Sequence, residues 1–377
     1  MPTLLAFLAL HLRRDARHDP QLPQLSRVET TARKPQLPQL SRRLGLVLAS
    51  FLAITPAMAT ERMTWPDLTD RAKPSPSASV SYGADPYQKA DLWMPEGRGP
   101  FPVAVMVHGG CWQTAIADRS LMNWIADDLR RSGVAVWNID YRGVDRPGGG
   151  YPGTFLDAGK AADLLRAEAG KHRLDLTRVA AVGHSAGGHL ALWLAGRRKL
   201  PAASPLRVAN PLRIERVVSL GGLPDLEATA TSPDNGCGTA VVAKLVGTGR
   251  ADPYADTSVP RLLPLGVRQD LVNGREDRII PHRMATDYVA RATKAGDRAT
   301  LHTIPDTGHV ELIAPETPAW AEAKRLILST LIPSRHGEGD RDAKRRGGGA
   351  APHGGAAGLP LHQPAAGPPP RSGEVKR

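Results

Sequence analysis

Short apolar runs and amphipathic stretches alternate along most of the chain. The apolar runs that predict strands lie at 79–82, 89–94, 102–107, 134–141, 179–182, 217–220, 267–272 and 301–304. The stretches that predict helices between them lie at 119–131, 154–169, 188–195, 283–295 and 318–331. Regular alternation of this kind predicts a doubly wound, mostly parallel sheet with right-handed crossovers.

Three parts of the chain depart from this rhythm. Residues 225–262 hold turn residues and one short helical run, which predicts a small cap insertion over a pocket; a plain surface excursion is the alternative. Residues 61–78 contain Lys-Pro-Ser-Pro-Ser and have the composition of a linker. Residues 335–377 are rich in Gly, Pro and Arg and cannot bury enough apolar area to order themselves. The folded domain is therefore expected at 79–334.

The first sixty residues have the composition of a leader. An apolar run at 44–54 follows Arg42 and Arg43 and precedes Ala-Met-Ala, so segment 42–59 has the layout of a secretory signal peptide. The run is too short for a membrane span. We therefore expect a periplasmic or secreted protein without a stable span in the mature chain, and a cytoplasmic one if the segment is not processed. An apolar anchor or a core helix is the alternative.

The signal-like segment begins more than forty residues into the chain. An octapeptide, Pro-Gln-Leu-Pro-Gln-Leu-Ser-Arg, occurs twice before or within it, at 20–27 and 35–42. A low-complexity duplication of this kind does not match the pattern of a packed helix or strand. We therefore expect translation to start later than Met1, for example at Val28 or Leu40, through an alternative start codon. N-terminal sequencing of the native protein tests this expectation.

Charge and composition exclude some function classes. The 377 residues, 41% of them hydrophobic, suit one large globular domain with appendages, and the net charge is +12. Residues 1–60 hold eight Lys/Arg against three Asp/Glu, and residues 335–377 hold eight against four, which leaves only +3 for 61–334. The basic excess lies mostly at the ends, so we do not expect a nucleic-acid groove. The chain also lacks metal-ligand spacing and a phosphate-binding loop.

The sequence Gly-His-Ser-Ala-Gly at 183–187 is the strongest candidate for chemistry. It lies between a predicted strand and a predicted helix, where a serine on a sharp turn adopts strained backbone angles. Small residues two positions before and after it make that turn possible. The turn lifts the hydroxyl of Ser185 out of the sheet, so Ser185 is the candidate nucleophile.

A second motif, His-Gly-Gly at 108–110, follows the apolar run 102–107. Acyl transfer builds negative charge on a former carbonyl oxygen, and two preorganised backbone N–H groups can stabilise that charge. We assign these donors to Gly109 or Gly110 and to Ala186, directly after the candidate nucleophile. A glycine turn without a catalytic role is the alternative.

The candidate acid and base follow the last two predicted parallel strands. Asp277 stands where a carboxylate could orient a histidine and stabilise its imidazolium form; Glu276 and Asp225 are its rivals. A helix N-cap is the structural alternative for Asp277. His309 lies in a Gly-His loop after the final strand, where it could act as general base. One helix and one strand separate Asp277 from His309, which is the length that brings neighbouring parallel strand ends together.

The order Ser185, Asp277, His309 resembles that of the α/β-hydrolase superfamily. The motifs at 108–112 (His-Gly-Gly-x-Trp) and 183–189 (Gly-His-Ser-Ala-Gly-Gly-His) resemble a branch of small-ester carboxylesterases, feruloyl-esterase-like hydrolases and arylformamidases such as kynurenine formamidase. This resemblance covers about 82–331. It implies an eight-stranded, mostly parallel sheet, a Ser-Asp-His triad and no cofactor, and its acid-bearing motif favours Asp277.

These residues predict a serine hydrolase that cleaves carboxylic esters of small substrates through an acyl-enzyme. An arylformamidase acting on amides such as N-formylkynurenine is the second possibility, and a peptidase the third. From another class, the chain could be a catalytically silent binding scaffold. We expect Trp112 to line the acyl or alcohol pocket, with a purely structural indole as the alternative.

The chain contains two cysteines, Cys111 after the proposed oxyanion loop and Cys237 in the insertion. In a secreted protein the two could form a disulfide beside the active site. Neither residue stands at a strand-to-helix turn of the kind that holds Ser185, which argues against a nucleophilic cysteine.

Overall fold

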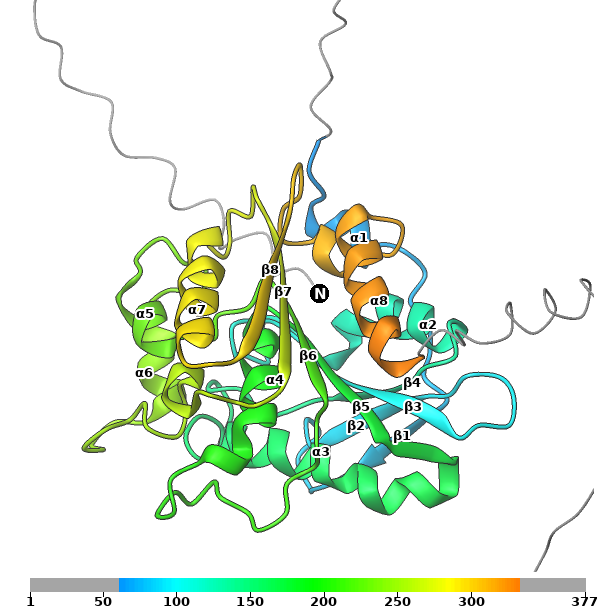
Figure 1. Ribbon diagram of the computed structural model, residues 1–377, viewed down its shortest axis with the longest axis horizontal. Helices are drawn as coiled ribbons and strands as arrows, with labels where there is room; N and C mark the ends of the chain where they lie inside the picture. The colour runs from blue at the N-terminus through cyan, green and yellow to red at the C-terminus, as the bar shows by residue number, and fades with distance from the viewer. Residues whose placement is uncertain (1–60, 333–377) are drawn as a thin grey trace, which may run out of the picture. The chain divides into compact units, whose positions relative to one another are not determined.

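One eight-stranded sheet organises residues 61–332, the part of the chain that this computed structural model describes (Figure 1). Its strands are β1 (Ala78–Ser81), β2 (Lys89–Trp93), β3 (Phe101–Val107), β4 (Ala135–Ile139), β5 (Leu174–His184), β6 (Arg216–Leu220), β7 (Arg268–Gly274) and β8 (Arg298–Ile304). They lie in the order β1-β2-β4-β3-β5-β6-β7-β8. Only the β1–β2 and β2–β4 pairs among these are antiparallel, which confirms the predicted mostly parallel sheet.

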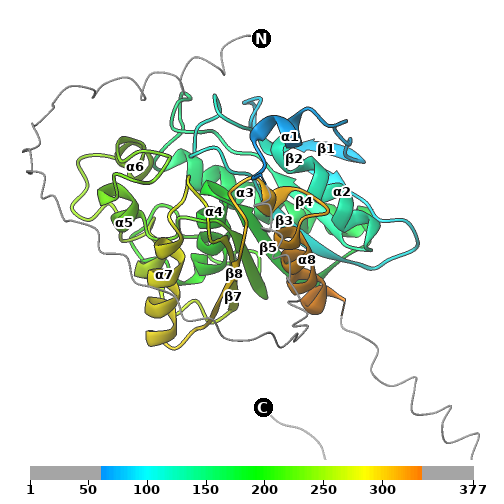
Figure 2. The same ribbon diagram turned by 90° about the horizontal axis from the view of Figure 1, so that it is seen from above.

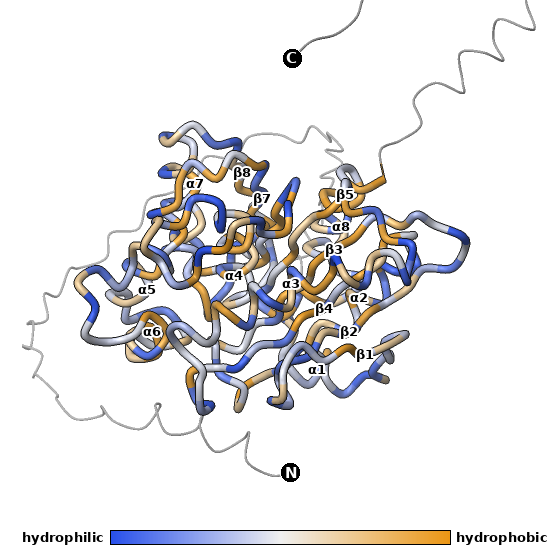
Figure 3. Tube along the Cα trace, turned by 90° about the horizontal axis from the view of Figure 1, so that it is seen from below, coloured by the Kyte–Doolittle hydropathy of each residue, from blue (hydrophilic) through white to orange (hydrophobic). Residues whose placement is uncertain are grey.

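Helices cover both faces of the sheet (Figures 1 and 2). One face packs against α3 (Gly153–His172), α4 (Ala186–Gly196) and α7 (His282–Lys294). The other packs against α1 (Trp65–Thr69), α2 (Asn123–Arg131) and α8 (Pro318–Leu331). Both faces need cover because successive side chains of a buried strand point to opposite sides. In β3, Val103 and Val105 enter the first core, whereas Ala104 and Met106 enter the second. Figure 3 shows hydrophobic segments along the central strands.

The carboxyl ends of the central strands meet at one edge of the sheet. In the parallel register, Val107 of β3 lies opposite Gly183 of β5, and His184 lies opposite Leu220 of β6. Leu220 in turn lies opposite Val272 of β7. Ligands of open α/β sheets bind beyond such strand ends. The loops that follow β3, β5, β7 and β8 therefore start close together.

The expected linker at 61–78 differs in the structure, because part of it is helix α1. Thr64 and Asp67 form a capping box at its start, and the side chain of Leu68 is fully buried in the second core. Farther along, the indole of Trp124 on α2 donates to the carbonyl of Ala72 at 3.1 Å. The helix is too short to show a periodic pattern, and the prolines and serines around it suggested a linker.

The insertion at 225–262 contains two short helices, α5 (Leu226–Thr231) and α6 (Ala240–Val246), and a 3₁₀ turn at Val259–Leu262. Val242 and Leu245 of α6 are fully buried in the first core. The insertion is therefore packed onto the domain. Its role in limiting substrate size stays a prediction.

The predicted leader, including segment 42–59, and the predicted tail at 335–377 lie outside the described residues. Within 61–332, no helix combines the length and the apolar character that crossing a bilayer would need.

Candidate active site

Ser185 occupies a sharp turn between β5 and α4. Its backbone angles, φ 54° and ψ −122°, lie in a region that non-glycine residues rarely adopt. A Cβ atom at Gly183 would lie 2.0 Å from the carbonyl oxygen of Gly187, and one at Gly187 would lie 2.2 Å from that of Val107. Both positions therefore require glycine, because any side chain would collide with backbone. The turn places Ser185 at the carboxyl edge of the sheet.

The loop after β3 lies directly against this turn. A Cβ atom at Gly109 would lie 3.1 Å from the Cβ of Ser185. Within 61–332, the backbone N–H groups of Gly109, Gly110 and Ala186 donate to no protein acceptor. Unpaired N–H groups beside a nucleophile are what an oxyanion hole requires. The sequence motifs assign the oxyanion donors to Gly109 or Gly110 and to Ala186, and that role stays a prediction.

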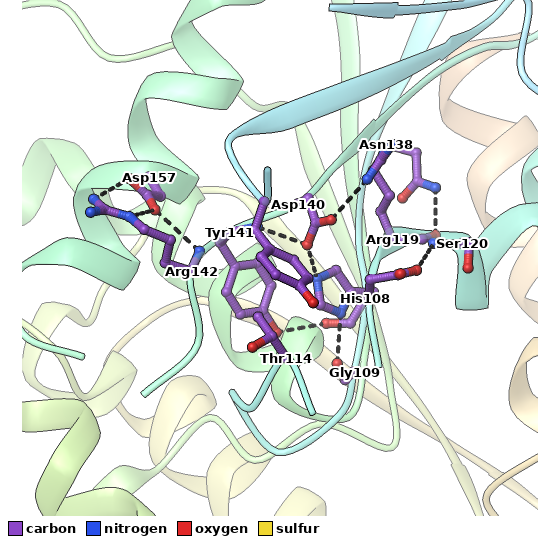
Figure 4. A network of polar contacts seen from close by, with 12 residues as sticks. His108, Gly109, Thr114, Arg119, Ser120, Asn138, Asp140, Tyr141, Arg142 and Asp157 are labelled. Atoms are coloured by element: carbon purple, nitrogen blue, oxygen red, sulfur yellow. Dashed lines mark hydrogen bonds and ion pairs between the residues drawn. The ribbon is translucent and has the colours of Figure 1, made fainter. Parts of the chain in front are cut away.

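A buried polar network holds the base of this loop (Figure 4). The Nε2 atom of His108 lies 2.9 Å from Oδ1 of Asp140, and the ring stacks on Tyr141 with centroids 4.4 Å apart. Tyr141 donates its hydroxyl to the His108 carbonyl at 3.1 Å. Arg119 pairs with Asp140 at 3.0 Å and with Asp91 at 2.8 Å, so the buried carboxylates are compensated. The network fixes the backbone that leads into Gly109.

A disulfide ties the other end of the loop to the insertion. Cys111 and Cys237 are bonded, with Cα atoms 5.3 Å apart. Gly110, Cys111 and Trp112 all have positive φ, at 97°, 52° and 56°. Glycine adopts a positive φ freely, but the same angle is costly at Cys111 and Trp112, and the disulfide anchors the first of these two.

Removing both cysteines should lower the free energy of unfolding by about 2–5 kcal/mol. The bond joins residues 126 positions apart, so its loss frees a long loop in the unfolded chain. The double variant Cys111→Ser/Cys237→Ser should also have a lower kcat, because the loop with the expected oxyanion donors loses its anchor. Urea unfolding and ester turnover measure the two effects. Wild-type protein treated with a thiol reductant is the control, and unchanged stability in both would contradict the expectation.

Asp277 and His309 meet after β7 and β8. Oδ2 of Asp277 lies 2.6 Å from Nδ1 of His309, and both side chains are buried. Oδ1 of Asp277 accepts the N–H groups of Ile279 and Ile280 at 2.8 and 2.9 Å. The carboxylate therefore holds the turn before α7 with one oxygen and the imidazole with the other. This geometry suits the orientation of a general base.

The two rival acids have other partners. Oε2 of Glu276 accepts the N–H of Thr307 at 3.1 Å. Asp225 caps α5 through the N–H groups of Glu227 and Ala228 and pairs with Arg291. Neither carboxylate contacts His309 among the contacts within the described chain.

His309 lies beside the Ser185 turn. Ser185 donates its N–H to the carbonyl of Leu220 at 2.8 Å, and a Cβ atom on the next residue, Gly221, would lie 3.2 Å from the ring of His309. His184 precedes the serine, and its Nε2 atom lies 3.2 Å from the carbonyl oxygen of His309. The imidazole rings of His184 and His309 have centroids 4.4 Å apart. The structure thus gathers Ser185, His309 and Asp277 at one sheet edge.

The His184 side chain stays neutral beside the candidate base. Burial, together with neighbouring His309, holds the pKa of His184 well below its usual range. A positive charge that forms on His309 therefore meets no second cation at this position.

Trp112, expected to line the pocket, is fully buried in the first core. Its indole packs edge-on to His189, with ring centroids 5.6 Å apart. No surface of the indole is open to a substrate here, so the structure favours the structural alternative. His189 is buried between this indole and Phe155 and makes a 2.8 Å contact through Nε2 with the carbonyl of Thr257.

Protein stability should fall on acidification because of His189. Burial lowers its pKa from 6.5 to about 4, so the unfolded chain takes up the proton first as the pH drops. The contribution of His189 to the free energy of unfolding is complete above about pH 6.5 and is lost as the pH falls toward 4. Between pH 7 and pH 5 the free energy of unfolding should fall by about 2 kcal/mol through this group. Urea unfolding at both values measures it. His189→Gln should show a smaller difference between the two pH values, and an unchanged difference would contradict this origin.

Two side chains that the sequence analysis left out also border the site. Trp65 of α1 lies against the rings of His184 and His309, and Glu311 accepts the N–H of Gly308 at 3.1 Å. The signal that could have found Trp65 is Thr-Trp-Pro-Asp at 64–67, a helix start with a proline in its first turn. Within 61–332, no three His, Cys, Asp or Glu side chains are grouped to hold a metal ion.

Comparisons with known proteins find both a family and individual relatives. The BD-FAE family model matches residues 90–286. Esterase LipC from Mycobacterium tuberculosis is 28% identical over 273 residues, which cover 68% of this chain and 65% of the relative. The versiconal hemiacetal acetate esterase from Dothistroma septosporum is 35% identical over 104 residues, which cover 27% of this chain and 30% of the relative. The chain thus spans less than two thirds of the length of either relative.

Solved structures are similar over most of the described residues. A truncated carbohydrate esterase from gut microbiota has a TM-score of 0.54 and 20% identity, covering 69% of this chain and 98% of that one. Thermogutta terrifontis esterase 2 phosphonylated by sarin has a TM-score of 0.58 and 18% identity, covering 70% of this chain and 99% of that one. At these identities the likeness concerns the fold.

Proposed function

Because this chain belongs to the BD-FAE family and has the α/β-hydrolase fold, we propose that it is a serine esterase acting on carboxylic esters of small molecules. The observation that carries the proposal is the 2.6 Å contact between Asp277 and His309 beside the strained turn of Ser185. The relatives named above are esterases, which supports ester hydrolysis over the other reactions of this fold.

The reaction proceeds through a covalent acyl-enzyme. Oγ of Ser185 attacks the ester carbonyl carbon while Nε2 of His309 takes the hydroxyl proton. The N–H groups of Gly109 or Gly110 and of Ala186 stabilise the negative carbonyl oxygen. The bond to the alkoxy oxygen then breaks, and His309 passes its proton to the departing alcohol.

Water completes the cycle by attacking the acyl carbon. His309 takes a proton from this water and returns it to Ser185 as the carboxylic acid leaves. Asp277 accepts the Nδ1–H of His309 in both halves of the reaction, which leaves Nε2 as the nitrogen that exchanges protons. The chemistry needs no group beyond these side chains and backbone donors.

A fluorophosphonate probe tests the nucleophile directly. The full chain should be labelled on Ser185, located by peptide mass spectrometry, and should hydrolyse p-nitrophenyl acetate. N-formylkynurenine, assayed in parallel, separates an esterase from an arylformamidase: faster turnover of the formamide would overturn the ester assignment. A chain that neither takes up the probe nor turns over either substrate would instead be a silent binding scaffold.

We also propose that the enzyme acts outside the cytoplasm. The signal-like segment 42–59 supports this, and so does the disulfide, because disulfides persist mainly in oxidising compartments. N-terminal sequencing of protein recovered from the periplasm or medium should find a mature terminus near Thr60. Recovery of an unprocessed chain from the cytoplasm would contradict the proposal.

A further inference from the structure

The segment before β1 supplies an aromatic side chain to the active site. The ring centroids of Trp65 and His309 lie 6.2 Å apart, and the two ring planes form an angle of 81°. For Trp65 and His184 the centroid distance is 6.3 Å and the interplanar angle is 76°. Trp65 belongs to α1, which precedes the stretch matched by the family model. The contact therefore comes from a part of the chain that the family match does not include.

Two carboxylates tie this segment to the loop that carries His309. Oε1 of Glu311 accepts the N–H of Met63 at 2.8 Å, while Oε2 accepts the N–H of Gly308 at 3.1 Å. Glu276 provides the second link. Its Oε2 atom accepts the N–H of Thr307 at 3.1 Å and lies 3.8 Å from Nη2 of Arg62.

The other end of the helix is anchored in the core. Leu68 is fully buried in the second core, and the capping box fixes the start of α1. Trp65, which is itself half-buried, is held between two fixed points. A side chain held this way keeps one position while substrates bind, as a specificity wall must.

The position of Trp65 defines which part of the substrate it meets. His309 hands its proton to the leaving alcohol, so the alcohol must depart on the side of the imidazole. The ring of Trp65 packs edge-on to that imidazole, with ring centroids 6.2 Å apart. We propose that Trp65 forms the wall of the leaving-group side and makes the enzyme prefer esters of aromatic alcohols to esters of small aliphatic ones. This inference rests on the proposed esterase function.

The experiment compares two acetates that share their acyl group and differ in the alcohol, phenyl acetate and ethyl acetate. Aromatic pairs of this kind contribute enough that Trp65→Ala should reduce the ratio of the two kcat/KM values by roughly 3- to 10-fold. Trp65→Phe keeps an aromatic ring and should hold the ratio within about twofold of wild type. Asp70→Asn, at the exposed end of the same helix, is the matched control and should leave the ratio unchanged.

A second substrate pair separates specificity from a structural effect. The ratio for ethyl acetate and ethyl butyrate, which differ only in the acyl group, should not change in Trp65→Ala. Two results for Trp65→Ala would overturn the inference while leaving the esterase function intact. One is an equal loss of kcat/KM on phenyl acetate and on ethyl acetate, and the other is a change only in the kcat/KM ratio of ethyl acetate and ethyl butyrate. A wild-type enzyme that hydrolyses none of these esters would refute the esterase function and the inference together.

Discussion

Replacing Ser185 by Ala should lower kcat for p-nitrophenyl acetate by on the order of 10⁶-fold, because the reaction loses its nucleophile and can no longer form an acyl-enzyme. The variant keeps the Cβ atom and therefore the backbone conformation of the turn, so its unfolding free energy should stay within about 1 kcal/mol of wild type. Stopped assays at high enzyme concentration measure the residual rate, and urea unfolding measures the stability.

Ser219 offers a matched control for this experiment. It lies on neighbouring β6, is fully buried, and its hydroxyl has no hydrogen-bond partner in the described part of the chain. Ser219→Ala should retain kcat within about threefold, since surface and core substitutions away from the reacting atoms act mainly on stability. Full turnover by Ser185→Ala, with loss of turnover in the control, would contradict the assignment of the nucleophile.

Asp277→Asn should lower kcat by on the order of 10⁴-fold, with much less change in KM. An amide can still accept the N–H groups of Ile279 and Ile280, so the turn before α7 survives. It cannot balance the positive charge on His309, and it favours the wrong tautomer of the imidazole. Steady-state kinetics across pH 6–9 measure the effect.

The rival acid Asp225 is the control for Asp277. Its carboxylate caps α5 and pairs with Arg291, so Asp225→Asn should change stability and leave kcat within about threefold of wild type. A large loss of kcat in Asp225→Asn together with an active Asp277→Asn would reverse the two roles.

Local sequence patterns predicted the sheet because its central strands are buried on both faces. Strand β3, for example, is apolar at every position, and all seven residues are buried. The site could be approached in the same way, since each candidate follows a strand and parallel strands end at one edge. Ser185 and His309 could be chosen from their motifs and their place after a strand, without knowledge of any long-range contact. Glu276 and Asp225 remained rivals of Asp277 by the same reasoning, and only the resemblance to α/β-hydrolases favoured Asp277.

Features that depend on tertiary contact could not be derived from the sequence. Whether Cys111 and Cys237 pair is decided by how closely the insertion packs on the oxyanion loop. The burial of Trp112 depends on its contact with His189 of α4. Trp65 was missed because α1 has only five residues, and its contacts with His309 span more than two hundred positions.

The Cys111–Cys237 bond has a consequence for proteolysis. It closes the chain around the segment that carries Ser185, while Asp277 and His309 lie beyond it. A protease that cuts one peptide bond between the two cysteines would therefore release no fragment. The nicked enzyme would migrate as one species on a denaturing gel and separate into two polypeptides only after reduction.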